Sequence, residues 1–420
     1  MTAAESVLDL FPTGTVLVDG ELVIGGSRAI DLAAAFGTPT YVIDEGFLRD
    51  RIRHYRDGLA RRFSDSRVYF ASKALPCAAI CRVVAEEGLG IDIAGGGELV
   101  VALAAGVPAS DMLLHGNAKT TTEIKMALAA GVGLYVIDNE GDIDRLVHLA
   151  TSPVDVLVRV RPSVPVHTHA ALATGDVDSK FGLGMDQAEA AIKRIRATRN
   201  LRLKGLHSHI GSGIFEADPF AKAVEAMAHL GDFEVYDLGG GLGERYTYSD
   251  PELSIDTYLD TLAAAVHTHL PSGSRILIEP GRSLVARSGV TLYEVINVKR
   301  SSKTFVAIDG GMADNLEVSL YGQRFEATMA SSVGGGESVT LVGRHCETGD
   351  ELIDGVSLRD PTPGGIVAVP VTGAYCFTMA NNYNGALRPP VVLVTNGVPR
   401  LVVRRETYDD ILARDVDFPT

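Results

Sequence analysis

Two ionisable residues stand at the ends of apolar, strand-like runs, where a charge is costly to bury. Lys73 stands near the end of VYFASKA (68–74), and Glu279 directly follows the apolar residues of SRILIEPGR (274–282). A lysine amine in such a place can form an imine, which removes its full positive charge. A carboxylate in the second place can hold a protonated ring nitrogen, although an ion pair with Arg282 would also explain it. Imine chemistry beside a nitrogen heterocycle is therefore one interpretation of the pair.

Glycine-rich turns follow two further runs of this kind. The stretch LGGGLG (238–243) and the GSG of HSHIGSG (207–213) would let backbone N–H groups approach an anion without Cβ obstruction. Gly240, Gly241 and Ser212 therefore predict a phosphate site, with an ordinary tight turn as the alternative. Pyridoxal 5'-phosphate needs an imine-forming lysine, a partner for its ring nitrogen and a phosphate site, so we expect this cofactor.

The histidines leave a metal site open as an alternative. His207 and His209 alternate along a strand and so lie on the same side of it, while His167 and His169 offer two more imidazoles. Zinc is the weaker interpretation because no carboxylate or cysteine stands at the usual ligand spacing. We therefore predict no metal.

These residues stand at the ends of a repeating pattern of β-rich run, turn and amphipathic helix between residues 68 and 282. The runs are VYFASKA, GLGIDIA, DMLLHGN, GLYVIDN, DVLVRVRP, RLKGLHSHI, FEVYDLGGG and SRILIEPGR. Eight nearly continuous apolar runs separated by helices predict a parallel (β/α)8 barrel of the TIM type. Such barrels carry their active sites at the C-terminal ends of the strands.

The pattern changes after about residue 287. Strand-like alternation broken by Gly and Pro, as in GVTLYEVINVKR (289–300), predicts a β-sandwich or β-barrel domain. GTVLVDGELVIGG (14–26) has the same pattern, and we expect it to add a strand to this domain. The fold class expected is therefore α/β. The predicted domains are 35–285 for the barrel, and 1–34 with 286–420 for a discontinuous β domain.

Composition limits the partners. The 420 residues are 46% hydrophobic and 22% charged, as in an ordinary globular protein. A net charge of −15 without a run of Lys or Arg argues against nucleic acid or an anionic membrane as a partner. No segment reaches the roughly 20 apolar residues of a membrane span, and the four cysteines form no paired framework. We therefore expect a cytoplasmic protein.

The sequence resembles a known family in six segments that occur in order over nearly the whole chain. They are YFASKA, HSHIGSG, DLGGGLG, IEPGR, CETGD and GAYCFTMANNYN. These segments are similar to those of the fold-type III pyridoxal-phosphate decarboxylases, and within them to the diaminopimelate decarboxylase branch. The resemblance implies an alanine-racemase-like barrel, pyridoxal 5'-phosphate as cofactor, and decarboxylation of a small amino acid.

The resemblance also implies roles for single residues. Lys73 is similar to the lysine that attaches the cofactor, His209 to the imidazole stacked on its ring, and Glu279 to the carboxylate that keeps the ring nitrogen protonated. The residues implied at the phosphate are Ser212, Gly240, Gly241, Gly281 and Tyr375, and those implied elsewhere beside the cofactor are Asp92 and Arg159.

Cys346 and Glu347 resemble a pair that enters the active site of the partner subunit. In the family this cysteine is the proton donor after CO2 has left. The resemblance therefore implies an obligate homodimer with shared active sites.

One segment departs from the family pattern. After DGGM the family carries an arginine that binds the distal carboxylate of diaminopimelate, and Glu317 stands there in this sequence, while Arg282, Tyr321 and Glu347 are retained as implied substrate residues. A like-charge contact in a desolvated pocket costs roughly several kcal/mol. We therefore expect a specialised-metabolism paralogue whose diamino or related substrate differs at its distal end. The alternative is a genuine meso-diaminopimelate decarboxylase that makes L-lysine, in which Arg324 binds the distal carboxylate in place of the missing arginine. Glu317 would alternatively be a loop residue that faces solvent.

Other classes of protein are weaker. An alanine-racemase-like enzyme would need a tyrosine base opposite Lys73, and the CETGD motif argues against it. A non-catalytic binding homologue is disfavoured because Lys73, Glu279 and Cys346 are all intact. A metal-dependent hydrolase has only the histidines in its favour.

Overall fold

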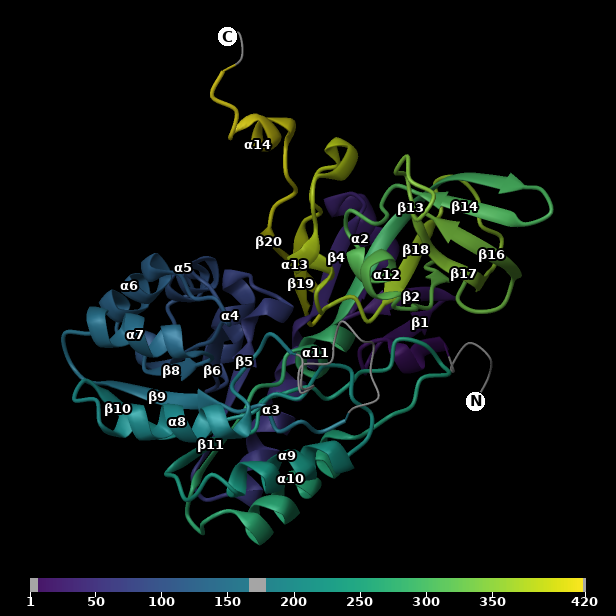
Figure 1. Cartoon of the computed structure of the whole chain (residues 1–420). Coiled ribbons are helices and arrows are strands. Elements are labelled where there is room, and N and C mark those ends of the chain that lie inside the picture. Colours follow the sequence, from purple (N-terminus) through teal and green to yellow (C-terminus); the bar gives the residue numbers. More distant parts are fainter. Residues whose placement is uncertain (1–6, 166–178, 418–420) are drawn as a thin grey trace. The chain divides into compact units, whose positions relative to one another are not determined.

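A closed parallel barrel forms one part of the chain, in a computed structural model that describes residues 7–165 and 179–417 (Figure 1). Its strands pair in the order β10-β11-β12-β5-β6-β7-β8-β9. They are β5 (Ser66–Ala71), β6 (Gly90–Ile93), β7 (Met112–Leu114), β8 (Leu134–Ile137), β9 (Val154–Arg159), β10 (Leu201–His207), β11 (Val235–Asp237) and β12 (Arg275–Ile278). Each strand overlaps one of the predicted runs, so the prediction of a (β/α)8 barrel is confirmed.

Helices alternate with these strands and lie outside the barrel (Figure 1). They are α3 (Glu45–Arg62), α4 (Ala78–Glu86), α5 (Gly96–Ala104), α6 (Thr121–Ala130), α7 (Glu140–Leu149), α8 (Met185–Arg196), α9 (Asp218–Ala228) and α10 (Ile255–His269). The bounds of α6 follow from its sequence. Thr120 and Glu123 form a capping box at its start, and Gly131 ends it with a left-handed φ of 80°.

Apolar side chains fill the barrel interior. One buried cluster joins residues from six of the strands: Tyr69, Leu113, Val136, Leu157, Val235 and Leu277. Burial of each large apolar side chain stabilises the fold by about 1.5–3 kcal/mol. This layer closes the barrel, and the polar residues considered below stand at the C-terminal ends of the same strands.

A second compact unit is built around a nine-stranded sheet, here called the β unit. The β unit comprises the described residues of Met1–Asp50, Arg245–Asp250 and Val285–Thr420, and the barrel unit comprises those of Arg51–Glu244 and Pro251–Leu284. The strands of the sheet are β4 (Thr40–Asp44), β13 (Gly289–Arg300), β14 (Thr304–Ile308), β15 (Thr328–Met329), β16 (Glu337–Val342), β17 (Glu351–Leu358), β18 (Ile366–Pro370), β19 (Val391–Thr395) and β20 (Val398–Val403). The prediction of a β domain after the barrel is confirmed.

The N-terminal segment lies in the β unit but does not join its large sheet. Its strands β1 (Val16–Val18), β2 (Glu21–Ile24) and β3 (Ser27–Arg28) form a three-stranded sheet of their own instead of extending the large sheet. A tight turn at Asp19 and Gly20, both with positive φ, folds β1 back onto β2 so that the two strands pair with each other. The N–H of Leu22 on β2 also donates to the carbonyl oxygen of Ala330. The strand that enters the large sheet from this end of the chain is β4, between β13 and β19.

The remaining helices are short. They are α2 (Ala29–Phe36), α11 (Arg282–Val285), α12 (Leu316–Tyr321), α13 (Cys376–Met379) and α14 (Tyr408–Leu412). Within residues 7–165 and 179–417, no helix is long and apolar enough to span a bilayer.

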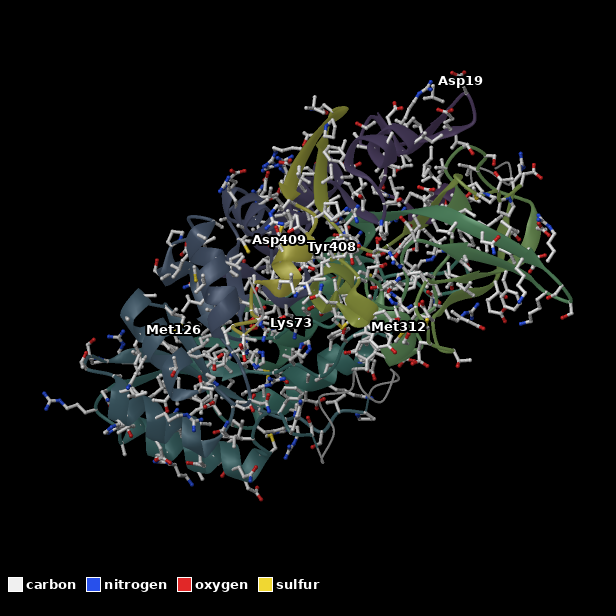
Figure 2. All side chains as sticks on the ribbon, turned by 90° about the horizontal axis from the view of Figure 1, so that it is seen from above. Asp19, Lys73, Met126, Met312, Tyr408 and Asp409 are labelled. Carbon is white, nitrogen blue, oxygen red and sulfur yellow. The ribbon has the colours of Figure 1, made fainter. Side chains whose placement is uncertain are left out.

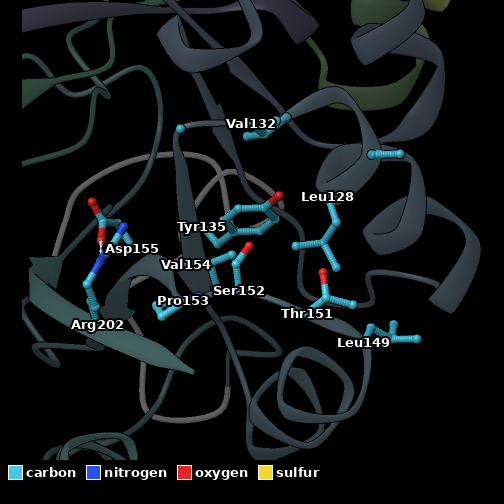
Figure 3. A pocket seen from close by; sticks show the side chains of 13 residues that line it. Leu128, Val132, Tyr135, Leu149, Thr151, Ser152, Pro153, Val154, Asp155 and Arg202 are labelled. Atoms are coloured by element: carbon cyan, nitrogen blue, oxygen red, sulfur yellow. Dashed lines mark hydrogen bonds and ion pairs between the residues drawn. The ribbon is translucent and has the colours of Figure 1, made fainter. Parts of the chain in front are cut away.

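A pocket of about 350 Å³ opens at the N-terminal ends of β8, β9 and β10 (Figure 3). Tyr135 lines it, together with Asp155 and Arg202, which form an ion pair at 2.5 Å. The predicted site residues lie at the other ends of the barrel strands, so this pocket is not the predicted active site.

Candidate active site

Glu279 is the centre of a buried polar cluster inside the barrel unit. One of its carboxylate oxygens, Oε1, contacts Nε2 of His115, and Oε2 lies 3.2 Å from Nε2 of His207. The three residues stand at the C-terminal ends of β12, β7 and β10, and barrel closure brings them together. Because each Glu279 oxygen faces one imidazole nitrogen, we interpret the group as a hydrogen-bonded cluster.

The charges in this cluster are set by its burial and by the imidazoles. Burial disfavours the Glu279 carboxylate, but His115 and His207 outweigh it and hold the pKa of Glu279 well below its usual range. Burial lowers the pKa of His115, but the attraction of the Glu279 carboxylate is stronger, so the pKa of His115 is raised overall. Burial lowers the pKa of His207 to about 4. Glu279 is therefore ionised at neutral pH, as a carboxylate that holds a protonated ring nitrogen must be.

Asp92 extends the cluster on the side of β6. Its Oδ1 lies 3.8 Å from Nε2 of His115. Burial raises the pKa of Asp92 to about 7, and repulsion by Glu279 adds to this effect while His115 opposes it. The structure therefore brings Asp92 and Glu279, two of the predicted cofactor residues, to the same imidazole.

Lys73 lies in a short 3-10 helix, Ser72–Ala74, directly after β5 (Figure 2). The hydroxyl of the preceding Ser72 is 2.8 Å from the carbonyl oxygen of Asp92 and 2.9 Å from Oε1 of Glu98, which holds this turn against β6. The side chain of Lys73 is exposed. The premise that its ammonium is buried is therefore wrong, and the amine is accessible to a carbonyl compound.

The loops after β10, β11 and β12 pack backbone against backbone. A Cβ at Gly240 would overlap the carbonyl oxygen of Glu279, and one at Gly241, with φ of 118°, would overlap that of Gly211. A Cβ at Gly281 would lie 3.0 Å from that of Ala71. Glycine is thus required at residues 240 and 241 for this close approach of the backbones.

Two side chains of these loops are oriented by hydrogen bonds. The N–H of Gly240 donates to Nδ1 of His209 at 3.2 Å, and Nε of Arg282 donates to Oγ of Ser212 at 3.3 Å. Burial lowers the pKa of His209 well below its usual range, and the positive charges of Lys73 and Arg159 add to the effect. A neutral, oriented imidazole is suited to stacking on an aromatic cofactor ring.

Arg159 is held at the end of β9. Its Nη1 donates to Oδ2 of Asp138 at 3.1 Å, and its guanidinium lies 4.7 Å from the centre of the Phe181 ring. The other Asp138 oxygen accepts the N–H of Gly182 at 3.0 Å. These contacts fix the guanidinium within the barrel unit.

The remaining predicted residues belong to the β unit, where the CETGD loop is tied to the DGGM segment. The Asp350 carboxylate accepts the N–H of Met312 at 2.7 Å and the N–H of His345 at 2.8 Å. Cys346 and Glu347 follow His345, and both side chains are exposed. The loop is therefore anchored at its base and presents these two side chains to solvent.

Helix α12 contacts the same loop, and α13 contacts the start of α12. Oγ of Ser319 on α12 is 3.4 Å from the carbonyl oxygen of Gly349, and Sγ of Cys376 on α13 is 3.6 Å from Oδ1 of Asn315. Tyr375 immediately precedes α13 with a left-handed φ of 61°. The β unit thus assembles the segments that carry Glu317, Tyr321, Cys346, Glu347 and Tyr375.

Glu317 contradicts one interpretation from the sequence. It lies on α12 and is 0% exposed, so it is not a solvent-facing loop residue. Arg324, three residues after the end of α12, is exposed.

Sequence reasoning missed several members of the barrel cluster. They are His115 and Asp237, together with Asp138, which binds Arg159 nearby. His207 was considered only as a zinc ligand. Each follows or ends a barrel strand, as Glu279 does, so the position at a strand end was the available signal. His167 and His169, the other proposed zinc ligands, lie outside the described residues.

A family model for the "Pyridoxal-dependent decarboxylase, pyridoxal binding domain" matches residues 48–286. The chain belongs to the pyridoxal-dependent decarboxylases. Its matched segment contains Lys73, the Glu279 cluster and the glycine-rich loops. The cofactor is therefore pyridoxal 5'-phosphate, and the protein is an amino-acid decarboxylase that depends on it.

Relatives of this pyridoxal-dependent decarboxylase match it over nearly its whole length. It is 45% identical to a diaminopimelate decarboxylase of Actinosynnema pretiosum subsp. auranticum, with 97% of this chain and 95% of the relative covered. It is 40% identical to the diaminopimelate decarboxylase of Bacillus subtilis (strain 168), with 96% of each covered.

A solved structure agrees in fold. The diaminopimelate decarboxylase of M. jannaschii in complex with L-lysine has a TM-score of 0.91 and 30% identity, with 97% of this chain and 99% of that chain covered. These relatives favour the diaminopimelate alternative over the specialised paralogue, and they favour a decarboxylase over a racemase or a metal-dependent hydrolase.

Proposed function

We propose that the chain decarboxylates meso-diaminopimelate and releases CO2 and L-lysine. The observation that carries the proposal is the match along nearly the entire chain to diaminopimelate decarboxylases, at 45% and 40% identity. The cluster around Glu279 supports it because a buried, ionised carboxylate is the group that such a cofactor requires.

Residues of the barrel unit would bind and orient the cofactor. Pyridoxal phosphate, when bound, supplies an electron sink for the charge that remains after CO2 departs. Lys73 would attach it through its accessible amine, His209 would stack on the ring, and Glu279 would hold the proton at the ring nitrogen. Arg159 and Asp92 would lie beside the ring. The phosphate would be bound by Ser212, Gly240, Gly241, Gly281 and Tyr375.

Cys346 would deliver the proton that replaces CO2 at the α-carbon. Its exposed position on an anchored loop supports a role in a second subunit, where an accessible side chain can enter another site. We accordingly include in the proposal a homodimer with shared active sites, in which Glu347 of the same loop contacts the substrate. Arg282 and Tyr321 would complete the substrate contacts.

The burial of Glu317 favours a second candidate function. A carboxylate that is 0% exposed on α12 replaces the arginine expected at this position. If this side chain meets the distal end of the substrate, a neutral or cationic distal group is preferred over a carboxylate. The second candidate is therefore the decarboxylation of a diamino acid that lacks the distal carboxylate.

A substrate panel separates the two candidates. We would measure kcat/KM for CO2 release from meso-diaminopimelate, lysine, ornithine and arginine, with Lys73→Ala as the inactive control. The proposed function predicts that meso-diaminopimelate has the largest kcat/KM and gives L-lysine as the product. Negligible turnover of meso-diaminopimelate would overturn it.

Variants at Glu317 sharpen the comparison. Under the proposed function, Glu317→Gln, an isosteric change, leaves the order of substrates unchanged. Under the second candidate, Glu317→Arg raises kcat/KM for meso-diaminopimelate by roughly tenfold or more, since about 1.4 kcal/mol of recovered transition-state binding gives that factor. Thermal unfolding of each variant would show whether the buried site tolerates the change.

A further inference from the structure

Asp237 is a buried carboxyl group to which the family motifs assign no role. It is the last residue of β11, beside β12, and is 0% exposed. Its Oδ1 accepts the N–H of Gly239 at 3.0 Å. Among the described residues, no N–H or hydroxyl donor reaches its Oδ2. An ionised carboxylate in this place would keep one buried oxygen without a donor, which is unfavourable.

Asp237 and Glu279 are close neighbours. One carboxylate oxygen each of Asp237 and Glu279, and one ring nitrogen each of His115 and His207, all lie within 4.8 Å of one another. Two carboxylates at such a distance do not both stay ionised in a desolvated site. Glu279 faces both imidazoles, whereas Asp237 has one backbone N–H, so the negative charge belongs on Glu279 and the proton on Asp237.

The electrostatics of the cluster agree with this assignment. Burial raises the pKa of Asp237 well above its usual range, and the charges of Glu279 and then Asp92 add to it, against the Gly239 N–H, which lowers it. Two carboxyl groups can share a hydrogen bond only when one of them carries a proton, and a protonated Asp237 would give its unpartnered Oδ2 such a bond.

We propose that Asp237 is a neutral carboxylic acid whose O–H donates to Glu279, and that it is a positioning residue for this carboxylate. Glu279 then accepts hydrogen bonds from three sides, from His115, His207 and Asp237, which fix its plane and keep its charge. The functional part of this inference rests on the proposed role of Glu279 toward the ring nitrogen of the cofactor.

Infrared spectroscopy of the cofactor-free protein tests the protonation state directly. At a pH of about 8.5, above the pKa values of about 7 for Asp92 and Asp314, the wild type should show a carbonyl band of a protonated carboxyl group that Asp237→Asn removes. The proposal that Asp237 is protonated would be overturned if the wild type lacked this band, or if the band persisted unchanged in Asp237→Asn.

Cofactor affinity tests the positioning role. Asp237→Asn retains a donor beside Glu279, so the dissociation constant of pyridoxal phosphate should stay within about threefold of the wild type, whereas Asp237→Ala should weaken binding by about tenfold or more. Thermal unfolding would confirm that both variants are folded. Equal losses in the two variants would overturn the positioning role. If Glu279→Gln binds the cofactor as tightly as the wild type, the proposed role of Glu279 is wrong, and the positioning role of Asp237 is wrong with it. The infrared result on the protonation of Asp237 would still stand.

Discussion

The backbone N–H of Gly240 donates a hydrogen bond to Nδ1 of His209, across 3.2 Å between the loops that follow β11 and β10. This bond assigns the remaining ring proton of neutral His209 to Nε2. It also links the glycine-rich turn to the imidazole, two features that the sequence presented as separate motifs. The orientation of His209 therefore depends on the absence of a side chain at residue 240.

Gly240→Ala should weaken cofactor binding. Its new Cβ would overlap the carbonyl oxygen of Glu279, so the loop must move and the bond to His209 is lost. We expect the dissociation constant of pyridoxal phosphate to rise by about tenfold or more, which corresponds to about 1.4 kcal/mol. Gly97→Ala is the matched control because nothing lies within 4 Å of its added Cβ. Unchanged binding in Gly240→Ala would contradict the predicted crowding.

Lys73→Ala should abolish both the covalent attachment of the cofactor and turnover. The exposed amine of Lys73, on the turn held by Ser72, is the group proposed to attach it. The visible absorption band of the bound cofactor and CO2 release would be measured together. Lys222→Ala, at an exposed surface lysine of α9, should leave both unchanged. Persistent turnover in Lys73→Ala would refute the assignment.

Cys346→Ala should reduce turnover while cofactor binding stays near normal. The cysteine is exposed on a loop anchored by Asp350, and its proposed task is proton delivery after CO2 has left. We expect kcat to fall by roughly 10²-fold or more, the usual contribution of a positioned proton donor. Thr348→Ala in the same exposed loop controls for disturbance of the loop itself. Equal effects of the two substitutions would speak for a structural role of the loop.

Asp92→Asn should change how the stability of the cofactor-free protein depends on pH. The pKa of Asp92 is about 7 in the folded chain and 3.8 when unperturbed, so the stability that its buried proton provides is complete below pH 3.8 and is lost as the pH rises to about 7. Asp92→Asn removes this loss. The free energy of unfolding of the variant relative to wild type should therefore rise by a few kcal/mol between about pH 4 and pH 8. Chemical denaturation at several pH values measures it, with Asp260→Asn, at an exposed residue of α10, as the control. A difference that does not vary with pH would contradict the shift.

The barrel was predictable because its signal is local. Each apolar run is short enough to be read as one strand, and a strand buried on both faces must be almost wholly apolar. The polar residue that ends such a run is then a site candidate, as Asp92, Arg159 and Glu279 were. The N-terminal hairpin lies in the β unit, but its separate sheet was not predicted, because the same alternating pattern suits a small sheet and a large one equally well.

The sequence by itself determined the strands, the cofactor and the family, because these depend on residue types and on spacing along the chain. Only the tertiary structure decided which side chains meet. His115 and Glu279 are 164 positions apart, and no local pattern pairs them. Burial was likewise decided by tertiary packing: Lys73 is exposed although it follows a buried strand, whereas Glu317 is buried although its sequence suits a surface loop. The charge state of a carboxyl group such as Asp237 depends on this packing, because desolvation and neighbouring charges exist only once the barrel has closed.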